Sequence, residues 1–345
     1  MRTTDVYVAG VGGFLPEVVS ADTAVAEGRY STEEIERYGL TGAAVAGELP
    51  APDMALAAAR QALERSGLTA EEIDTLLYVT VWHQGPDGWC PQAYLQRHLL
   101  GGDCLAAEIR QGCNGVFGAL ELAAARLLAG REGRGALIAA ADNFGTPLVD
   151  RWRANPGFVL GDGASSLVLS NRDGFARLRS VATRTVPEME QLHRGTEPLF
   201  PPGATTGGQL DFGSRAGAFF ASPDRPADAG LRLFKAQEEL IGQSLEEAGV
   251  KLADITRVAY MNTERDMVED RLLRPLGLPL ERSTWDYGRG IGHIAASDQV
   301  LSFEHLLATG ALRPGDHLLA IGIGPGVGIG SAVIEILRTP DWQTR

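Results

Sequence analysis

The sequence predicts an α/β fold built from two similar halves. Short continuous apolar runs, typical of strands buried on both faces, alternate with amphipathic helical patterns. Residues 61–79 resemble residues 243–261, at an offset of 182 positions (243 − 61 = 182). The 345 residues also suffice for two core-bearing units of roughly 170 residues, an ordinary domain size. We therefore expect two halves, residues 1–171 and residues 172–345.

Strands and helices can be assigned in order along both halves. Predicted strands cover residues 6–11, 75–81, 104–109, 135–141, 164–169, 256–261, 317–323 and 328–336. Predicted helices cover residues 53–66, 114–128, 230–248, 266–275 and 294–308. The stretches 145–157 and 193–229 are predicted as loops. Helices between and outside two sheets would give a five-layered arrangement.

Composition and charge narrow the functional classes. A net charge of −13 and a pI of about 5.0 argue against a nucleic-acid or anionic-membrane partner. No apolar stretch reaches the roughly 18 residues that a membrane span needs, and residues 1–5 do not begin a secretory signal. Three cysteines are too few and too irregularly spaced for a disulfide framework or a zinc site. We expect a reduced, cytoplasmic protein without a metal.

Cys113 is the candidate nucleophile. Residues 108–118, EIRQGCNGVFG, are typical of a strand end, a sharp turn of small residues and a helix that begins at the cysteine. Such a turn exposes the sulfur, and the positive end of the helix dipole favours the thiolate. Cys104 and Cys90 lack this setting, so we expect them to be structural.

His293 is the candidate base, because the repeat pairs it with Cys113. Each follows a glycine at the start of an apolar helix, 180 positions apart (293 − 113 = 180). If the halves pack about a pseudo-twofold axis, a thiol and an imidazole meet in one cleft, and imidazole titrates near neutral pH. Asp298 could orient the ring. It follows His293 by five positions, however, so the two side chains can meet only if the first turn of the helix is irregular. Alternatively, Asp298 only complements the helix dipole.

Two further features border this predicted site. His83 and His193 lie in predicted loops and could touch substrate. The glycine-rich residues 322–330 fit no G-x-G-x-x-G register and lead into a strand, so they do not predict a dinucleotide loop. Close approach of this backbone to a reacting acyl group, with an exposed amide as oxyanion donor, is the better interpretation.

Over essentially its whole length the chain resembles the β-ketoacyl-carrier-protein synthase III branch of the thiolase superfamily. The matching features are the turn at Cys113, the GDGAS turn at residues 161–165 and the glycine-rich residues 324–330. The resemblance implies the thiolase fold, with duplicated βαβαβαββ halves in a five-layered αβαβα arrangement. It also implies a cysteine acylated by acyl-CoA or acyl carrier protein, a homodimer, and no metal or redox cofactor.

The chain departs from the condensing members at two positions. Asn262 stands where they carry the catalytic histidine, and His293 stands where they carry asparagine. This exchange resembles the ketosynthase-III-like acyltransferases of bacterial antibiotic and polyketide pathways, of the cervimycin sugar malonyltransferase type. The resemblance implies Cys113 as nucleophile, His293 as base, Asp298 as its partner, the Cys113 and Gly326 amides as oxyanion hole, and Asn262 as an active-site contact. Acyl groups, malonyl among them, would pass to a hydroxyl of a sugar or natural-product intermediate without decarboxylation.

The resemblance also suggests contacts with the donor. Arg37 stands where the family has a CoA-contacting arginine, although the neighbouring tryptophan position is Glu33. Arg151 and Arg153 are expected to contact phosphates at the tunnel mouth.

Two alternatives remain open from the sequence. A starter-unit condensing enzyme would use Asn262 and His293 as donors to an enolate, whereas acyl transfer to an alcohol needs a base, and a histidine backed by a carboxylate is the better base. A silent partner subunit of a condensing heterodimer is the other alternative, and the intact Cys113 argues against it.

Overall fold

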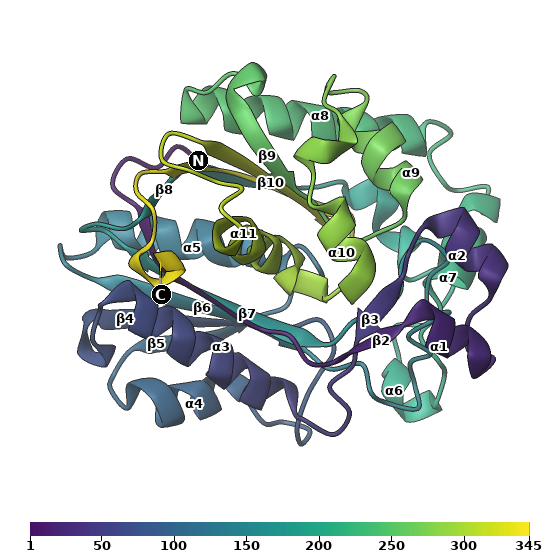
Figure 1. Ribbon diagram of the computed structural model, residues 1–345. Helices are drawn as coiled ribbons and strands as arrows, with labels where there is room; N and C mark the ends of the chain where they lie inside the picture. Colours follow the sequence, from purple (N-terminus) through teal and green to yellow (C-terminus); the bar gives the residue numbers. More distant parts are fainter. Residues whose placement is uncertain (345) are drawn as a thin grey trace.

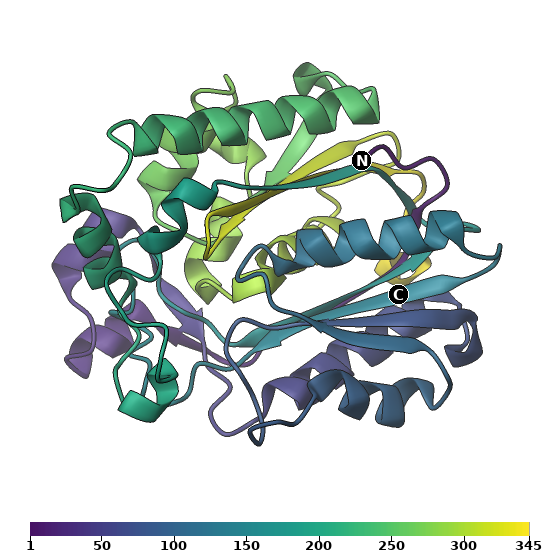
Figure 2. The same ribbon diagram turned by 180° about the vertical axis from the view of Figure 1, so that it is seen from behind.

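The computed structural model describes residues 1–344, and the main strands of its two halves form one continuous nine-stranded sheet that bends into two stacked layers, the first sheet and the second sheet (Figures 1 and 2). The first sheet contains β1 (Tyr7–Phe14), β4 (Ile73–Val79), β5 (Leu105–Ile109), β6 (Gly135–Asp142) and β7 (Gly163–Ser170). The second contains β8 (Ala176–Thr185), β9 (Ile255–Ala259), β10 (His317–Gly324) and β11 (Gly328–Ile336). The strand order is β5-β4-β6-β7-β1-β8-β11-β10-β9, and the sheets meet where β1 pairs with β8.

Helices form the other three layers. Helices α3 (Ala51–Ser66) and α4 (Pro91–Leu95) cover the outer face of the first sheet, and α8 (Ala229–Ala248) covers the outer face of the second. Between the sheets lie α5 (Gly115–Ala129) and α11 (Asp298–Ala308), as both views show (Figures 1 and 2). The predicted five-layered α/β arrangement is thereby confirmed. Because sheet layers flank α5 on both sides, Phe117 is buried as well as Val116, Leu120, Ala123 and Leu127.

The remaining elements are short and gather at one end of the layers (Figure 1). They are β2 (Val18–Ser20), β3 (Gly42–Ala44), α1 (Ala21–Ala26), α2 (Thr32–Tyr38), α6 (Gly203–Thr206), α7 (Phe212–Ala221), α9 (Arg265–Val268) and α10 (Trp285–Ile291). The stretch 193–229, predicted as a loop, therefore contains two helices. Helix α7 begins there because the Asp211 side chain accepts a hydrogen bond from the Ser214 amide and caps its first turn.

The sequence repeat corresponds to equivalent helix–strand connections. Helix α3 ends at Gly67 and α8 ends at Gly249, and both glycines have a φ of +67°. This left-handed conformation favours glycine, and it turns the chain into β4 in one half and towards β9 in the other. No helix among residues 1–344 has the length and apolar character to cross a membrane.

Two details differ from the sequence prediction. Strand β8 lies outside the predicted strands, although Ala176, Leu178 and Ser180 are buried in alternation with Arg177 and Arg179. The second half also has no counterpart of β5 among the described residues, so the predicted βαβαβαββ order is complete only in the first half. A single parallel bridge between residues 258 and 283 takes its place, because the polar segment 280–284 offers no apolar run for an edge strand.

Candidate active site

Cys113 lies in a tight turn between β5 and α5. Gly112 has a φ of +61°, and a Cβ atom there would lie 2.4 Å from Pro325 Cδ, so both the conformation and the space require glycine. Asn114 is the N-cap residue and α5 begins at Gly115, one residue after the start of the predicted range 114–128. The cysteine therefore precedes the helix, with its side chain partly exposed next to the helix N-terminus.

His293 reaches Cys113 from the second half of the chain. Its Nε2 atom lies 3.0 Å from Cys113 Sγ, and the ring is only 1% exposed. The backbone is fixed by the first half: His293 N donates to the Val159 carbonyl at 2.7 Å, and Gly161 N donates to the His293 carbonyl at 2.9 Å. The repeat-based expectation that these two residues meet agrees with this geometry.

Asp298 contacts the other nitrogen of the histidine. Its Oδ2 atom lies 2.5 Å from His293 Nδ1, and the carboxylate is fully buried. Five positions suffice because the chain between them is irregular: Ala295 has a φ of +47°, residues Ala295–Ser297 form a 3-10 turn, and α11 begins at Asp298. The Ile294 amide donates to Asp298 Oδ1 at 2.7 Å and closes this turn.

Charge and burial act in opposite directions on His293. Burial alone lowers its pKa, but the charges of Asp298 and Cys113 and the hydrogen bonds to both raise it, and the pKa lies well above its usual range. The charge of Asp298 and the contact with Cys113 thus favour the protonated form of the ring.

Asp142, at the end of β6, is a second buried acid near His293. Burial raises its pKa to about 7. Hydrogen bonds from the amides of Trp82 and Val81 and from the hydroxyl of Thr80, together with the charge of His293, act in the opposite direction and lower this pKa. Its carboxyl group thereby holds the turn at residues 80–82, and Val81 and Trp82 pack in the same apolar cluster as Cys113.

Asn262 contacts the acid and not the nucleophile. Its backbone N–H donates to Asp298 Oδ2 at 2.8 Å, and its side-chain Nδ2 donates to Asp298 Oδ1 at 3.0 Å and to the Gly292 carbonyl at 2.8 Å. The active-site contact expected of Asn262 is thus made through Asp298. No hydrogen bond joins its amide to Cys113 among the described residues.

The glycine-rich segment passes directly beside the cysteine. A Cβ atom on Gly324 would lie 2.7 Å from the Asn114 backbone nitrogen and 3.0 Å from that of Cys113, so this approach requires glycine. Gly326 has a φ of +80°, and a Cβ there would meet open space. The backbone of this segment therefore passes beside the backbone of the Cys113 turn.

The three arginines proposed as donor contacts have different surroundings. Arg151 is buried, and its guanidinium donates to both Asp162 oxygens at 3.1 and 2.9 Å and to the Leu160 carbonyl at 3.0 Å. Its burial conflicts with the expected phosphate contact, because this cation is already paired inside the protein. Arg37 and Arg153 are exposed, and Arg153 donates to the Gly28 carbonyl between α1 and α2.

An apolar cavity of about 570 Å³ opens between α7, α8 and β10. His193, one of its lining residues, has a pKa lowered to about 4 by burial and by the charge of Arg215, so its ring is neutral at pH 7. A row of rings leads from it to His293: the centroid distances are 5.9 Å from His193 to Phe212, 6.2 Å from Phe212 to Phe158, and 4.7 Å from Phe158 to His293. Sequence reasoning missed both phenylalanines: Phe158 lies in an irregular segment, and Phe212 begins α7 within a stretch predicted as a loop.

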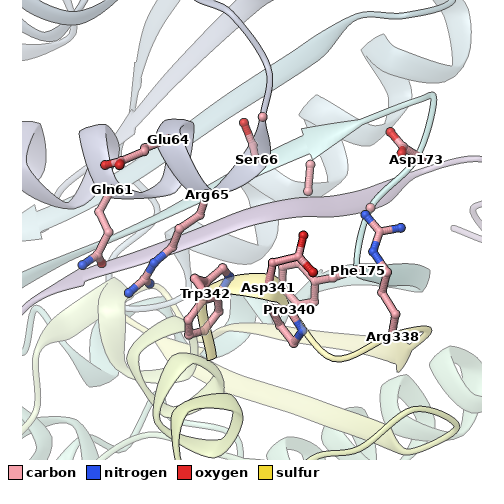
Figure 3. A pocket seen from close by; sticks show the side chains of 13 residues that line it. Gln61, Glu64, Arg65, Ser66, Asp173, Phe175, Arg338, Pro340, Asp341 and Trp342 are labelled. Atoms are coloured by element: carbon pink, nitrogen blue, oxygen red, sulfur yellow. The ribbon is translucent and has the colours of Figure 1, made fainter. Parts of the chain in front are cut away.

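A second cavity, of about 480 Å³, lies between the end of α3 and the C-terminal segment (Figure 3). Arg65 stacks there on Trp342, with 4.1 Å between the guanidinium carbon and the ring centroid, and also pairs with Glu304 at 2.6 Å. Neither Cys113 nor His293 lines this cavity, so it is separate from the candidate site.

Comparisons with known proteins agree with this geometry. The family models 3-oxoacyl-[acyl-carrier-protein (ACP)] synthase III and its C-terminal part match residues 107–186 and 245–336. Acetoacetyl CoA synthase NphT7 of Streptomyces sp. (strain CL190) is 28% identical, over 95% of this chain and 98% of that protein. Among solved structures, the acyltransferase ChlB3 is 54% identical, with a TM-score of 0.94 and 98% and 100% of the two chains covered. The synthase III FabH of Pseudomonas aeruginosa PAO1, 22% identical with a TM-score of 0.78 over 97% and 99%, shares the fold.

Proposed function

This chain belongs to the 3-oxoacyl-[acyl-carrier-protein] synthase III-like family of thiolase-fold enzymes, which act on acyl thioesters, and we propose that it transfers an acyl group by way of a thioester on Cys113. The donor is acyl-CoA or an acylated carrier protein, and the acceptor is a hydroxyl group of a small molecule. The proposal rests on the continuous contacts from Cys113 Sγ through His293 to Asp298. This series supplies a nucleophile, a base and an acid that orients the base.

In the first half-reaction the Cys113 thiolate attacks the carbonyl carbon of the donor thioester. A carbon–sulfur bond to Cys113 forms, the bond to the donor sulfur breaks, and that sulfur leaves with the proton of the His293 imidazolium. The Cys113 and Gly326 amides are the proposed donors to the carbonyl oxygen while it carries negative charge, because the glycine-rich segment that contains Gly326 passes beside the Cys113 backbone.

In the second half-reaction His293 acts as a base. Acylation removes the negative charge of Cys113, which is one of the causes that raise the pKa of His293 in the resting enzyme. The pKa therefore falls in the acyl-enzyme, and the neutral ring can accept the proton of the acceptor hydroxyl. The oxygen attacks the thioester carbon, an ester forms, and Cys113 leaves as the thiolate beside the imidazolium.

Carbon–carbon bond formation is the second candidate, because relatives such as NphT7 are named as synthases of acetoacetyl-CoA. Decarboxylative condensation needs two hydrogen-bond donors aimed at the developing enolate. Asn262 occupies the position of one of them by resemblance, yet its amide donates to Asp298 and Gly292 instead. The direction of this amide favours acyl transfer. The intact contacts of Cys113 also argue against a silent partner subunit.

The surroundings of Cys113 favour an uncharged acyl group over malonyl. The cysteine packs against a cluster whose buried members are Phe144, Val149, Ala154, Leu160 and Ala295. A malonyl carboxylate in such surroundings needs a cation, because desolvating an unpaired charge is costly. The nearby Arg151 already pairs with Asp162.

We also propose the wider setting that the resemblance suggests: a cytoplasmic homodimer of antibiotic or polyketide biosynthesis that needs no metal or redox cofactor. The test of the function is intact-mass measurement after incubation with a panel of acyl-CoAs, followed by addition of hydroxyl acceptors. One acyl adduct per chain, lost when an acceptor is added and recovered as an ester, is the expected result. A chain that gains no mass from any acyl-CoA or acylated carrier protein would contradict the proposal.

A further inference from the structure

Asp298 accepts hydrogen bonds from other groups besides His293. Its two oxygens also accept N–H groups from Ile294 at 2.7 Å, from the Asn262 backbone at 2.8 Å and from the Asn262 side chain at 3.0 Å. A fully buried carboxylate is stable only when it is paired and hydrogen-bonded. Asn262 supplies two of these three donors, so it is the principal anchor of the acid.

The same amide group also fixes the backbone next to the base. Asn262 Nδ2 donates to the carbonyl of Gly292, the residue before His293. On its other side the amide oxygen lies against α10, where a Cβ atom on Gly288 would be 2.1 Å from Asn262 Oδ1. The amide is therefore held in one orientation, between the acid, the backbone before the base and helix α10.

We infer that Asn262 is a positioning residue of the Cys113–His293–Asp298 series: it fixes Asp298 against His293 and so directs Nε2 of the ring at the sulfur. The inference rests on the proposed function, and it assigns Asn262 no contact with substrate. A carboxylate in a fixed orientation holds the proton on Nδ1, which leaves Nε2 to exchange a proton with Cys113.

Replacing Asn262 with a neutral residue changes no charge in the site. The charged or titratable groups that face His293 are Cys113, Asp298 and Asp142, and Tyr287 faces Asp298 from α10. A neutral substitution of Asn262 leaves all of these in place. A change in the pH behaviour of Cys113 would then report on the geometry between Asp298 and His293.

Two variants in the full-length protein test the inference, each with a matched control. Asn262→Ala removes the amide, and Asn171→Ala removes a similar asparagine, which bonds three backbone groups at the far end of α5. Gly288→Ala keeps the amide but displaces it, whereas a Cβ on Gly290, in the same helix, meets only Thr41 Oγ1 at 3.8 Å. Gly290→Ala therefore controls for the gain in helix propensity.

The first readout is the rate of Cys113 alkylation by iodoacetamide as a function of pH, followed by peptide mapping. In Asn262→Ala and Gly288→Ala the misplaced carboxylate stabilises the imidazolium less, so alkylation should require a higher pH than in the wild type. The second readout is acyl transfer, where we expect kcat to fall about 10- to 100-fold, as when partners that orient a functional histidine are removed. KM should stay near the wild-type value, since Asn262 does not contact substrate. Both controls should match the wild type in both readouts.

The inference is overturned if Asn262→Ala and Gly288→Ala keep the wild-type alkylation profile, whether or not transfer falls, because a general structural role predicts no change in that profile. If Asn262→Ala does not fold, Gly288→Ala decides alone, since it retains every polar group. Failure of the proposed function gives a different result: wild-type Cys113 would then react no faster than Cys90, and no acyl adduct would form.

Discussion

Cys113 and His293 are 180 residues apart in the chain, yet their Sγ and Nε2 atoms lie 3.0 Å apart. Each half of the chain contributes one of them, from the segment that precedes a central helix. The thiol and the imidazole can exchange a proton only when both halves are folded and packed. The reactivity of Cys113 therefore depends on the tertiary structure.

Cys113 should be the only cysteine that becomes acylated. It has an imidazole within hydrogen-bonding distance, whereas burial raises the pKa of Cys104. Peptide mapping after treatment with an acyl-CoA should locate the added mass on Cys113, and Cys113→Ala should abolish transfer. Cys90→Ala and Cys104→Ala serve as controls and should retain activity. Turnover by Cys113→Ala, or an adduct on Cys104, would refute the mechanism.

His293→Ala should reduce the transfer rate by about 10²- to 10⁴-fold, the usual contribution of general acid–base catalysis. The variant loses both the proton for the leaving sulfur and the base for the acceptor. Steady-state transfer with saturating donor measures the effect. A rate within a few-fold of the wild type would exclude His293 as the base.

Asp298→Asn should shift the pH dependence of Cys113 upward. The Asp298 charge raises the pKa of His293 against the opposing effect of burial, and burial remains in the variant. The pKa of His293 must therefore fall, so the imidazolium that stabilises the thiolate is lost at a lower pH than in the wild type. Alkylation of Cys113 should then need a higher pH. An unchanged alkylation profile would show that Asp298 does not tune the histidine.

Malonyl groups that load at all should be passed on whole. The Asn262 amide bonds Asp298 and Gly292, so a second donor for an enolate is missing from the expected position. With carboxyl-labelled malonyl-CoA and a hydroxyl acceptor, the label should stay in the ester product. Stoichiometric labelled carbon dioxide together with a β-keto product would instead establish the condensing reaction.

A homodimer should form through the free edge of β5. This strand pairs only with β4 within the described chain, and Leu105 on it and Leu122 on the neighbouring α5 are 49% and 55% exposed. Pairing with a second copy would provide hydrogen-bond partners for the backbone groups along this edge and would cover both leucines. Light scattering at micromolar concentration should give a dimer mass, and Leu105→Lys should shift it toward the monomer. A wild-type monomer under these conditions would contradict the prediction.

Arg151→Met should destabilise the fold by about 3–5 kcal/mol, because it leaves the buried Asp162 carboxylate unpaired. The free energy of unfolding in urea, followed by circular dichroism, measures this loss. Arg153→Met, at an exposed site, should change it by no more than about 0.5 kcal/mol. If the two variants were equally stable, the ion pair between Arg151 and Asp162 would not contribute to stability as expected.

How far the sequence predicts this site depends on what determines each residue's position. The repeat locates Cys113 and His293, because both precede a central helix and their side chains contact each other. Local pattern also contains the signal for β8, whose alternating burial matches its alternating sequence. The direction of the Asn262 amide depends on how α10 packs against it, and the pairing of Arg151 depends on the path of the chain to Asp162. Such long-range packing has no counterpart in local periodicity or spacing.

The backbone contacts of His293 with Val159 and Gly161 have a mechanical consequence. By sequence the histidine belongs to the second half, but its main chain is bonded to the half that carries the nucleophile. The main chain of the imidazole is thus held by the same half as the sulfur, whereas the cavity walls from α7 and α8 belong to the other half. Substitutions on α7 and α8 can therefore reshape the cavity without removing the backbone contacts that place the imidazole beside the sulfur.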